Sequence, residues 1–564
     1  MLPLRKQMSA TEKFVAARQF LLDHRTDYQK AYREFRWPDL SNFNWARDWF
    51  DVYAQGNSKT ALWLKREGKD EVKFSYQELA ERSDRVAHFL QRQGVGPGDR
   101  IVLCLPNVAA IWDLMLAAIK IGAIIVPTTT LATESEIRDR LARSGARIVV
   151  TDETAIDRIP SDAEVKRILV GGQTAGWMPY AAALEEARDY RIIPTQADDP
   201  FLLYFTSGTT AKAKLVLHTH QSYPVGHLST MYWIGIQESD IHQNISSPGW
   251  AKHAWSSFFA PWNAGATNFV YDAPRFRAAN TLRTLEEVGV TTLCAPPTVW
   301  RMVILENLGS KPRALRELAS AGEPLNPEVI EHVEKAWGLV IRDGYGQTET
   351  SALIGNSPGQ QVKLGSMGRP LPGFQINLVD MQDQECPEGE VAVKLDPRPT
   401  GLMTGYMDDP DLTRAAMQNA LYHTGDQAAL DEDGYFFFVG RADDVFKSSD
   451  YRISPFQLES ILMEHPLVAE VAIVPSPDPL RTNVPKAFIA IVADARPSEE
   501  IAREILLFAK EKLAGYERVR KLEFHELPKT ISGKIRRAQL RKMEAQRVKD
   551  EQRGPLEFWL KDFE

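Results

Sequence analysis

Residues 202–214 join a strand pattern to a set of groups that suit a polyphosphate. Leu202 to Phe205 are four consecutive apolar or aromatic residues, which is typical of a strand. A run of hydroxyls, one glycine and two lysines follows: Thr206, Ser207, Gly208, Thr209, Thr210, Lys212 and Lys214. Clustered hydroxyl and amide donors beside an ammonium group favour clustered negative charge, such as phosphate oxygens. A solvated Ser/Thr-rich turn is the alternative interpretation, and the spacing is not that of a Walker loop.

Five further segments carry glycine-punctuated turns or charged groups in a fixed order. They are Ala321-Gly322-Glu323-Pro324; Asp343-Gly344-Tyr345-Gly346-Gln347-Thr348-Glu349-Thr350; Tyr422-His423-Thr424-Gly425-Asp426; Gly440-Arg441-Ala442-Asp443-Asp444; and Pro528 to Arg537, which contains Ser532-Gly533-Lys534. Each is a weak signal alone, but all of them in order are a strong one. Together they resemble the adenylate-forming superfamily of acyl- and aryl-CoA synthetases, peptide-synthetase adenylation domains and adenylating luciferases. The lead-in Phe43-Asn44-Trp45 is most similar to the medium-chain acyl-CoA and benzoate-CoA synthetases.

Length, charge and cysteine usage restrict the class of protein. A chain of 564 residues is too long for one core, so at least two domains are expected. The net charge of −8 argues against nucleic acid as the main partner. Cys104, Cys294 and Cys386 lie far apart, which excludes a disulfide framework or a zinc site built on paired cysteines. Residues 1–28 lack a signal-peptide pattern, and the most apolar run, residues 114–126, is too short for a membrane span, so we expect a cytoplasmic protein.

Hydrophobic periodicity predicts an α/β fold whose large N-terminal domain contains mostly parallel sheets flanked by helices. Helices are predicted at Ser75–Gln91, Ala109–Ile121, Glu134–Ser144 and Ala278–Glu287, and strands at Arg100–Leu105, Ala123–Val126, Ala146–Thr151, Thr267–Tyr271 and Thr291–Ala295. From Pro455 the order helix, strand, strand, helix predicts a small α+β C-terminal domain. We therefore expect an N-terminal domain of residues 1–440, with the ATP and acyl sites, and a mobile C-terminal domain of residues 441–564.

The resemblance implies a two-step reaction with ATP, Mg²⁺ and CoA. A carboxylic acid (fatty, alicyclic or aromatic) would form an acyl-AMP with release of pyrophosphate, and the acyl group would pass to the CoA thiol. Two alternatives stay open: an enzyme that loads the phosphopantetheine of a carrier protein, and a non-catalytic ligand-binding relative. Lys534, Glu349 and Asp426 at the family's motif positions argue against the second of these. The sequence does not separate CoA from a carrier protein as acceptor.

The resemblance also implies a role for each motif. Phosphates would be held by Thr206, Ser207, Gly208, Thr209, Thr210 and Lys214; the base by Gly322, Glu323, Pro324 and Tyr345, with Asp343, Gly344, Gly346 and Gln347 in the same motif; the α-phosphate by Thr348; Mg²⁺ by Glu349; and the ribose by Asp426 with Arg441. Lys534 would bridge carboxylate and α-phosphate oxygens, because two anions that react need a cation placed between them. Lys447 would approach the site in the second step, after rotation about Asp443. Arg452 is a weaker nucleotide candidate, with a solvated surface arginine as the alternative.

The acyl group is expected near Ser247 to Trp255, with Trp250, His253 and Trp255 as candidates. No acidic residue lies between Asp240 and Asp272, so a buried substrate ammonium would stay unpaired, which argues against an α-amino acid. Aromatic side chains suit a ring or an alkyl chain. Each tryptophan could instead be ordinary core, and His253 could face the carboxylate or only satisfy a loop carbonyl.

Three residues depart from the family's pattern. Ala211 and Ala213 stand where a glycine and a proline are usual, so we expect a differently bent loop and weaker or slower ATP binding. Asp450 stands where glycine is usual, beside the expected path of the pantetheine arm. Its carboxylate would cost desolvation there, unless it points to solvent and has no effect.

Overall fold

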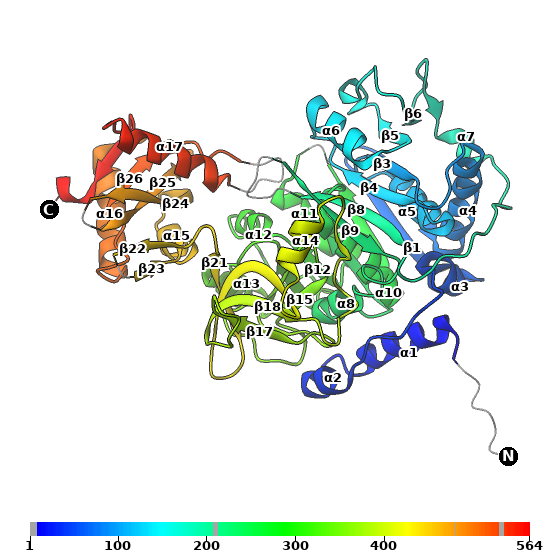
Figure 1. Cartoon of the computed structure of the whole chain (residues 1–564), viewed down its shortest axis with the longest axis horizontal. Helices are drawn as coiled ribbons and strands as arrows, with labels where there is room; N and C mark the ends of the chain where they lie inside the picture. The colour runs from blue at the N-terminus through cyan, green and yellow to red at the C-terminus, as the bar shows by residue number, and fades with distance from the viewer. Residues whose placement is uncertain are drawn as a thin grey trace. The chain divides into compact units, whose positions relative to one another are not determined.

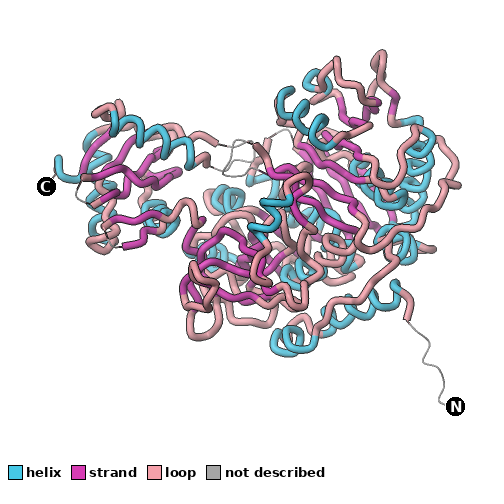
Figure 2. The backbone as a smooth tube through the Cα atoms, viewed as in Figure 1, coloured by secondary structure: helices cyan, strands magenta, loops and turns pink. Residues whose placement is uncertain are grey.

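The computed structural model describes residues 8–206, 212–273, 275–449, 451–479, 481–529 and 535–563. Contacts divide the chain into two units: unit 1 comprises residues 1–376 and 393–422, and unit 2 comprises residues 377–392 and 423–564. Strands are surrounded by helices and loops in each unit (Figure 2). The expected functional boundary after residue 440 stays a prediction.

Unit 1 contains two large sheets, as the periodicity predicts (Figure 1). Among the described residues, the first has the order β19 (Gly405–Tyr406), β9 (Lys214–Thr219), β8 (Pro200–Thr206), β4 (Ile124–Thr128), β3 (Arg100–Cys104), β5 (Ile148–Asp152), β6 (Lys166–Val170), β7 (Met178–Pro179). The second has the order β16 (Arg369–Pro370), β15 (Ala352–Gly355), β14 (Ile341–Gly346), β13 (Glu317–Ala321), β12 (Thr292–Ala295), β10 (Ile241–Asn244), β11 (Thr267–Asp272), β1 (Thr60–Arg66), β2 (Val72–Ser75). The strands from β4 to β7 and from β14 to β1 are parallel, and β9, β15, β16, β19 and β2 add antiparallel edges.

Helices cover these sheets. They are α1 (Ala10–Asp23), α2 (Tyr28–Glu34), η1 (Trp45–Asp51), α3 (Val52–Ala54), α4 (Tyr76–Arg92), α5 (Ala109–Ile121), α6 (Glu134–Ser144), η2 (Ile156–Arg158), α7 (Ala181–Leu184), α8 (Leu228–Ile234), α9 (Ala251–Ala254), η3 (Trp255–Phe259), α10 (Ala260–Ala264), α11 (Ala278–Val288), α12 (Pro297–Val303), α13 (Pro327–Trp337) and α14 (Pro410–Ala416). Helices α5 and α6 have the predicted bounds, and α4 begins after the predicted cap, Ser75, which forms a capping box with Glu78. No helix among the described residues has the length and hydropathy that a membrane crossing requires.

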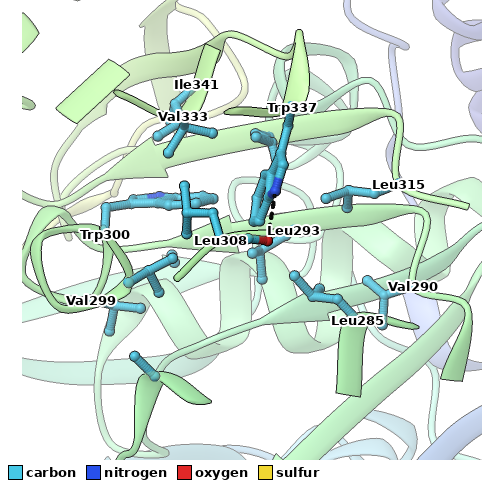
Figure 3. Packing of buried hydrophobic residues seen from close by; sticks show 14 of the residues in the cluster. Leu285, Val290, Leu293, Val299, Trp300, Leu308, Leu315, Val333, Trp337 and Ile341 are labelled. Atoms are coloured by element: carbon cyan, nitrogen blue, oxygen red, sulfur yellow. Dashed lines mark hydrogen bonds between the residues drawn. The ribbon is translucent and has the colours of Figure 1, made fainter. Parts of the chain in front are cut away.

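The second sheet is held by a core of large side chains from β12 to β14 and the helices beside them (Figure 3). Trp300 of α12 and Trp337 of α13 are buried there, and the indole of Trp337 donates to the carbonyl of Leu308 at 3.2 Å. This packing fixes the strands whose carboxyl ends carry the Gly322 and Tyr345 motifs. Ligands of parallel sheets bind beyond such carboxyl ends.

Unit 2 contains the α+β unit predicted from residue 455 onward. Its main sheet has the order β24 (Val468–Asp478), β25 (Thr482–Ile491), β26 (Lys521–Phe524), β27 (Glu557–Trp559), with α15 (Pro455–Met463), α16 (Glu499–Lys512), α17 (Arg537–Lys549) and η4 (Leu560–Asp562). A small hairpin joins β22 (Phe446–Ser448) to β23 (Tyr451–Ile453). Most of a further four-stranded sheet, β17 (Ile376–Val379), β18 (Glu388–Lys394), β20 (Leu421–Leu430) and β21 (Phe436–Arg441), also falls in this unit.

Candidate active site

The predicted phosphate loop joins two antiparallel strands of the first sheet. Thr206, the last residue of β8, pairs in register with Lys214, the first residue of β9. The hairpin therefore brings a hydroxyl and an ammonium group of the motif to neighbouring positions. Ser207, Gly208, Thr209, Thr210 and Ala211 lie outside the described residues, so the expected bend at Ala211 stays a prediction.

Tyr406 connects this hairpin to the predicted metal ligand. It lies on β19, which pairs with β9. Its ring centroid is 5.1 Å from Nζ of Lys214, and its hydroxyl donates to Oε1 of Glu349 at 3.1 Å. The cation predicted for phosphate and the carboxylate predicted for Mg²⁺ thus contact one tyrosine. Tyr406 was not among the predicted site residues, because a two-residue strand gives almost no periodic signal.

His218 holds the backbone of Thr348, the residue predicted to contact the α-phosphate. One ring nitrogen, Nε2, is 2.8 Å from the carbonyl oxygen of Thr348, and Nδ1 is 3.1 Å from Oγ of Ser222. Burial lowers the pKa of His218 to about 4, so the ring is neutral at physiological pH and donates from Nε2 to that carbonyl. His218 was also absent from the predicted site residues, because a single histidine in a strand has no distinctive spacing.

Asp343 ties together the two segments expected around the adenine. The backbone amides of Leu325 and Gly344 donate to its carboxyl group at 3.4 and 3.0 Å. Burial raises the pKa of Asp343 to about 8, although these two amide donors act in the opposite direction. A carboxyl group within β14, largely protonated near neutral pH, therefore holds the segment that follows Gly322.

Residues of the Gly322 and Tyr345 segments keep partial access to solvent. Gly322 is exposed at φ +110°, a conformation that side-chain-bearing residues rarely adopt, and Glu323 and Pro324 are half-buried after it. Residues 345–349 are all half-buried, and the side-chain oxygen of Gln347 accepts from the hydroxyl of Tyr422 at 2.8 Å. Residues 345–349 therefore present groups that a ligand could reach, while the sheet holds the backbone of this segment in place.

The expected acyl segment runs between the ends of the two sheets. A side chain on Gly249 would lie 2.4 Å from the backbone nitrogen of Thr129, just after β4, so Gly249 packs closely there. At the other end, a side chain on Gly346 would lie 2.6 Å from the ring of Trp255, so Trp255 packs against the end of β14. Trp250, the N-cap of α9 between these anchors, is half-buried.

His253 is buried beside the side chain of Asn107. Its Nε2 lies 3.0 Å from Oδ1 of Asn107, and burial lowers its pKa to about 3. The ring is therefore neutral and donates to that side-chain amide. Asn107 is neither of the two predicted partners, so a contact of His253 with the substrate carboxylate or with a loop carbonyl stays a prediction.

The predicted ribose ligands are neighbours within unit 2. Asp426 on β20 and Arg441 on β21 are register partners, and Nη1 of Arg441 lies 3.0 Å from Oδ1 of the buried Asp426. A carboxylate fixed in this way can accept from two adjacent hydroxyls.

The remaining predicted residues also belong to unit 2. Asp443 is an exposed turn residue whose carbonyl accepts from Arg541, and whose carboxylate lies 3.6 Å from Nε of Arg441. Lys447 on β22 is exposed and is the register partner of Arg452 on β23; the side chain of Arg452 is outside the description. Lys534 lies outside the described residues.

In the described part of the chain, one cluster of acidic side chains has carboxylates close enough to one another to hold a metal ion. It consists of Glu523, Glu544 and Glu557 in unit 2, and none of these was predicted as a ligand. The ammonium of Lys486 lies 2.8, 2.5 and 2.8 Å from their carboxylates, so a lysine already occupies the position of a cation. We assign this cluster to the core of unit 2.

Two family models match the chain. "AMP-binding enzyme" matches residues 50–407, and "AMP-binding enzyme C-terminal domain" matches residues 457–534. A curated relative, 4-hydroxybutyrate–CoA ligase 1 of Metallosphaera sedula, is 42% identical over 534 residues, covering 92% of this chain and 94% of the relative. The human mitochondrial acyl-coenzyme A synthetase ACSM3 is 38% identical over 542 residues, covering 92% of each.

Solved structures agree with this assignment. The anthranilate CoA ligase AuaEII in complex with anthranoyl-AMP has a TM-score of 0.81 at 27% identity, covering 90% of this chain and 98% of its own. A benzoate CoA ligase from Burkholderia xenovorans LB400 has a TM-score of 0.77 at 27% identity, covering 88% of this chain and 100% of its own. The predicted superfamily and fold class are confirmed: the chain belongs to the AMP-binding enzyme family, in the group of acyl- and aryl-CoA ligases.

Proposed function

We propose that this protein activates a small carboxylic acid with ATP as an acyl-AMP, releases pyrophosphate and transfers the acyl group to CoA. The observation that carries the proposal is the placement of Lys214, Tyr406 and Glu349 in contact at the hairpin that follows β8. A cation and a carboxylate fixed together suit the binding of a nucleoside triphosphate with its metal ion. The acid is unassigned among fatty, alicyclic and aromatic carboxylic acids.

The individual roles are part of this proposal. Thr206 and Lys214 bind the β- and γ-phosphates with the residues between them, and Tyr345 stacks on the base. Asp426 and Arg441 bind the ribose. Thr348, whose backbone His218 holds, contacts the α-phosphate, and Lys534 neutralises charge between the carboxylate and that phosphate. Fixed donors and cations lower the barrier because they need no reorganisation when the charge develops.

Mg²⁺ is the proposed metal, with Glu349 as its protein ligand. Mg²⁺ is usually bound by one or two carboxylates together with substrate phosphates. Glu349 fits this pattern, since its half-buried carboxylate already accepts from a hydroxyl that lies beside Lys214. Bound Mg²⁺ would neutralise phosphate charge, and Glu349 would hold it in position.

The acceptor and the location are also proposed. CoA is preferred because the curated relatives named above are CoA ligases. A carrier protein stays the alternative acceptor, and a non-catalytic relative the alternative function. A cytoplasmic location is supported by Cys104, Cys294 and Cys386, which are all free thiols and suit a reducing compartment.

Pyrophosphate exchange over a panel of acids, followed by thioester assays, tests the proposal. The panel contains butyrate, hexanoate, benzoate, 4-hydroxybutyrate and succinate, with CoA or phosphopantetheinylated carrier protein as acceptor. We expect acid-dependent exchange and a CoA thioester. Exchange with a thioester on the carrier protein alone would favour the alternative, and no exchange with any acid would contradict the adenylation step.

We expect Asp443→Pro to separate the two half-reactions. Proline fixes φ and would prevent the backbone rotation that a hinge needs, while the carbonyl that accepts from Arg541 is retained. Thioester formation should fall by about tenfold or more, with pyrophosphate exchange largely preserved. The control is Glu432→Pro. The amide of Gly434 donates to the carbonyl of Asp431, and Glu432 is the second residue of this turn, a position that tolerates proline. Equal loss of both steps in Asp443→Pro would contradict the hinge.

A second prediction concerns Asp450, which lies outside the described residues. If its carboxylate narrows the path of the pantetheine arm, Asp450→Gly should raise the rate of thioester formation several-fold without changing pyrophosphate exchange, because desolvation of the carboxylate is then no longer required. The control is Asp494→Gly, an exposed turn position of the same unit. Wild-type rates for both steps in Asp450→Gly would make Asp450 a neutral substitution.

A further inference from the structure

The carbonyl oxygen of Ala213 is held by an arginine of helix α6. Nη2 of Arg143 donates to this oxygen at 2.8 Å. Ala213 is half-buried directly before β9, and its side chain packs against a core cluster that includes Leu141 of α6 and Phe205 of β8. The residue that stands where a proline is usual is therefore fixed by side-chain packing and by a hydrogen bond from a charged group.

Arg143 is itself held in position for this contact. It lies in the last turn of α6. Its guanidinium carbon is 5.5 Å from the centroid of the Phe205 ring, and its Nη1 is 3.4 Å from Oδ2 of Asp139, one turn earlier. Arg140 lies at the same distance from that ring, but its Nη1 donates to the carbonyl of Glu136 within α6. Of these two arginines, Arg143 is the one whose hydrogen bond reaches the hairpin in the described part of the chain.

The hydrogen bond acts on the peptide unit that joins Ala213 to Lys214. Lys214 is the register partner of Thr206, the residue that follows Phe205 on β8. Arg143 therefore contacts both arms of the hairpin around the predicted phosphate loop, through the Phe205 ring on one arm and the Ala213 carbonyl on the other. Because a peptide unit is planar, holding the carbonyl of Ala213 also restricts the backbone of Lys214.

We propose that Arg143 is a positioning residue for ATP, which holds the backbone of Lys214 in its ATP-binding conformation and replaces the restraint that a proline gives at position 213. This rests on the function proposed above and concerns the same phosphate site. Proline fixes φ and so removes alternative conformations of a segment, whereas alanine does not. A guanidinium group has planar donors of fixed geometry, so a hydrogen bond from it can restrict the same segment. A loop that is already ordered loses less conformational entropy when its ligand binds, which raises the affinity.

Three variants isolate this restraint. Arg143→Gln removes the guanidinium group, Ala213→Pro restores the usual proline, and the double variant combines the two changes. The control is Arg138→Gln, because Arg138 lies on the same helix but donates to Asp162 and Glu134 at 2.9 Å. The readouts are the Kd for ATP by calorimetry without acid, the unfolding midpoint, and, in pyrophosphate exchange, kcat and the KM values for ATP and for the acid.

We expect Arg143→Gln to raise the Kd and the KM for ATP about tenfold, the lower limit for a hydrogen bond from a charged group. The KM for the acid and kcat at saturating ATP should change by less than about twofold, because the lost interaction acts on ATP binding. In the double variant, Ala213→Pro should return the Kd to within about threefold of the wild-type value, since it restricts the same backbone. Ala213→Pro alone and Arg138→Gln should bind ATP as the wild type does.

Three results would overturn the inference. They are a wild-type Kd for ATP in Arg143→Gln, a raised Kd that the added proline does not lower, and an equally raised Kd in Ala213→Pro alone or in Arg138→Gln. If Arg143→Gln does not fold, Arg143→Lys takes its place, with a smaller rise and the same recovery expected, because lysine keeps the charge without the planar donors.

The wild-type enzyme separates this inference from the proposed function. Acid-dependent exchange in the wild type, together with any of these three results, would overturn the role of Arg143 alone. The absence of exchange in the wild type with every acid would instead contradict the proposed adenylation.

Discussion

Lys534→Ala should reduce the rate of acyl-AMP formation by about 100- to 1,000-fold, which is the usual effect of removing one group that stabilises transition-state charge. The carboxylate and the α-phosphate are both anions, and a cation between them lowers the energy of their approach. ATP binding should be largely retained, because the proposed contacts to the base, ribose and outer phosphates involve other residues. The measurement is acid-dependent pyrophosphate exchange, together with the Kd for ATP by calorimetry.

A control for this variant lies on the same segment. Lys529 is partly exposed and its ammonium is 2.7 Å from Oε1 of Glu470, a pair of the surface type that contributes little. Lys529→Ala should exchange pyrophosphate at nearly the wild-type rate. An unchanged exchange rate in Lys534→Ala would show that Lys534 is a solvated lysine.

Lys486→Met should destabilise unit 2 by about 3–5 kcal/mol, the range found when one partner of a buried charge pair is removed. Glu523 and Glu544 would lose their contacts with the ammonium, at 2.8 and 2.5 Å, while they remain buried. The third carboxylate, Glu557 at 2.8 Å, would lose the same partner. We expect a lower midpoint of thermal or denaturant unfolding for unit 2, as measured by calorimetry and far-UV circular dichroism.

This loss of stability should depend on pH in a defined direction. Burial alone would lower the pKa of Lys486, but the surrounding carboxylates outweigh it and raise the pKa above 10.5. The pKa of Glu557 is instead lowered below 4.5; burial opposes this shift, and hydrogen bonds from the Gly554 amide and Lys486 outweigh it. The contribution of Lys486 is thus complete below pH 10.5 and lost as pH rises through its folded pKa; that of Glu557 is complete above pH 4.5 and lost as pH falls. The difference between wild type and variant should be largest between these limits.

Two further variants make this prediction specific. Lys549→Met removes an exposed lysine at the end of α17, the helix that carries Glu544, and should leave the unfolding midpoint unchanged. Adding Glu544→Gln to Lys486→Met should recover part of the loss, because it removes a buried carboxylate that would keep only the longer contact with Lys521, at 3.7 Å, among the ion pairs of the described residues. Unchanged unfolding of Lys486→Met itself would show that the cluster does not stabilise unit 2.

The elements that the sequence predicted well depend on local interactions. The helix α4 follows a Ser75–Glu78 capping box, and α5 and α6 end at glycines in left-handed conformations. The same local signal at Ser9 and Glu12 begins α1, for which no helix was predicted. Caps and periodicity are read from residues three or four positions apart, so they are visible without the fold.

The sequence by itself determined the family, the reaction class and the order of the motifs, because these are properties of residue types along the chain. Only the tertiary structure decided which side chains meet. Tyr406 reaches Glu349 and Lys214 through the pairing of β19 with β9. The ammonium of Lys252, on α9, has no hydrogen-bond partner in the structure. Contacts between residues far apart in the sequence depend on strand pairing and side-chain packing, which cannot be predicted from a local sequence pattern.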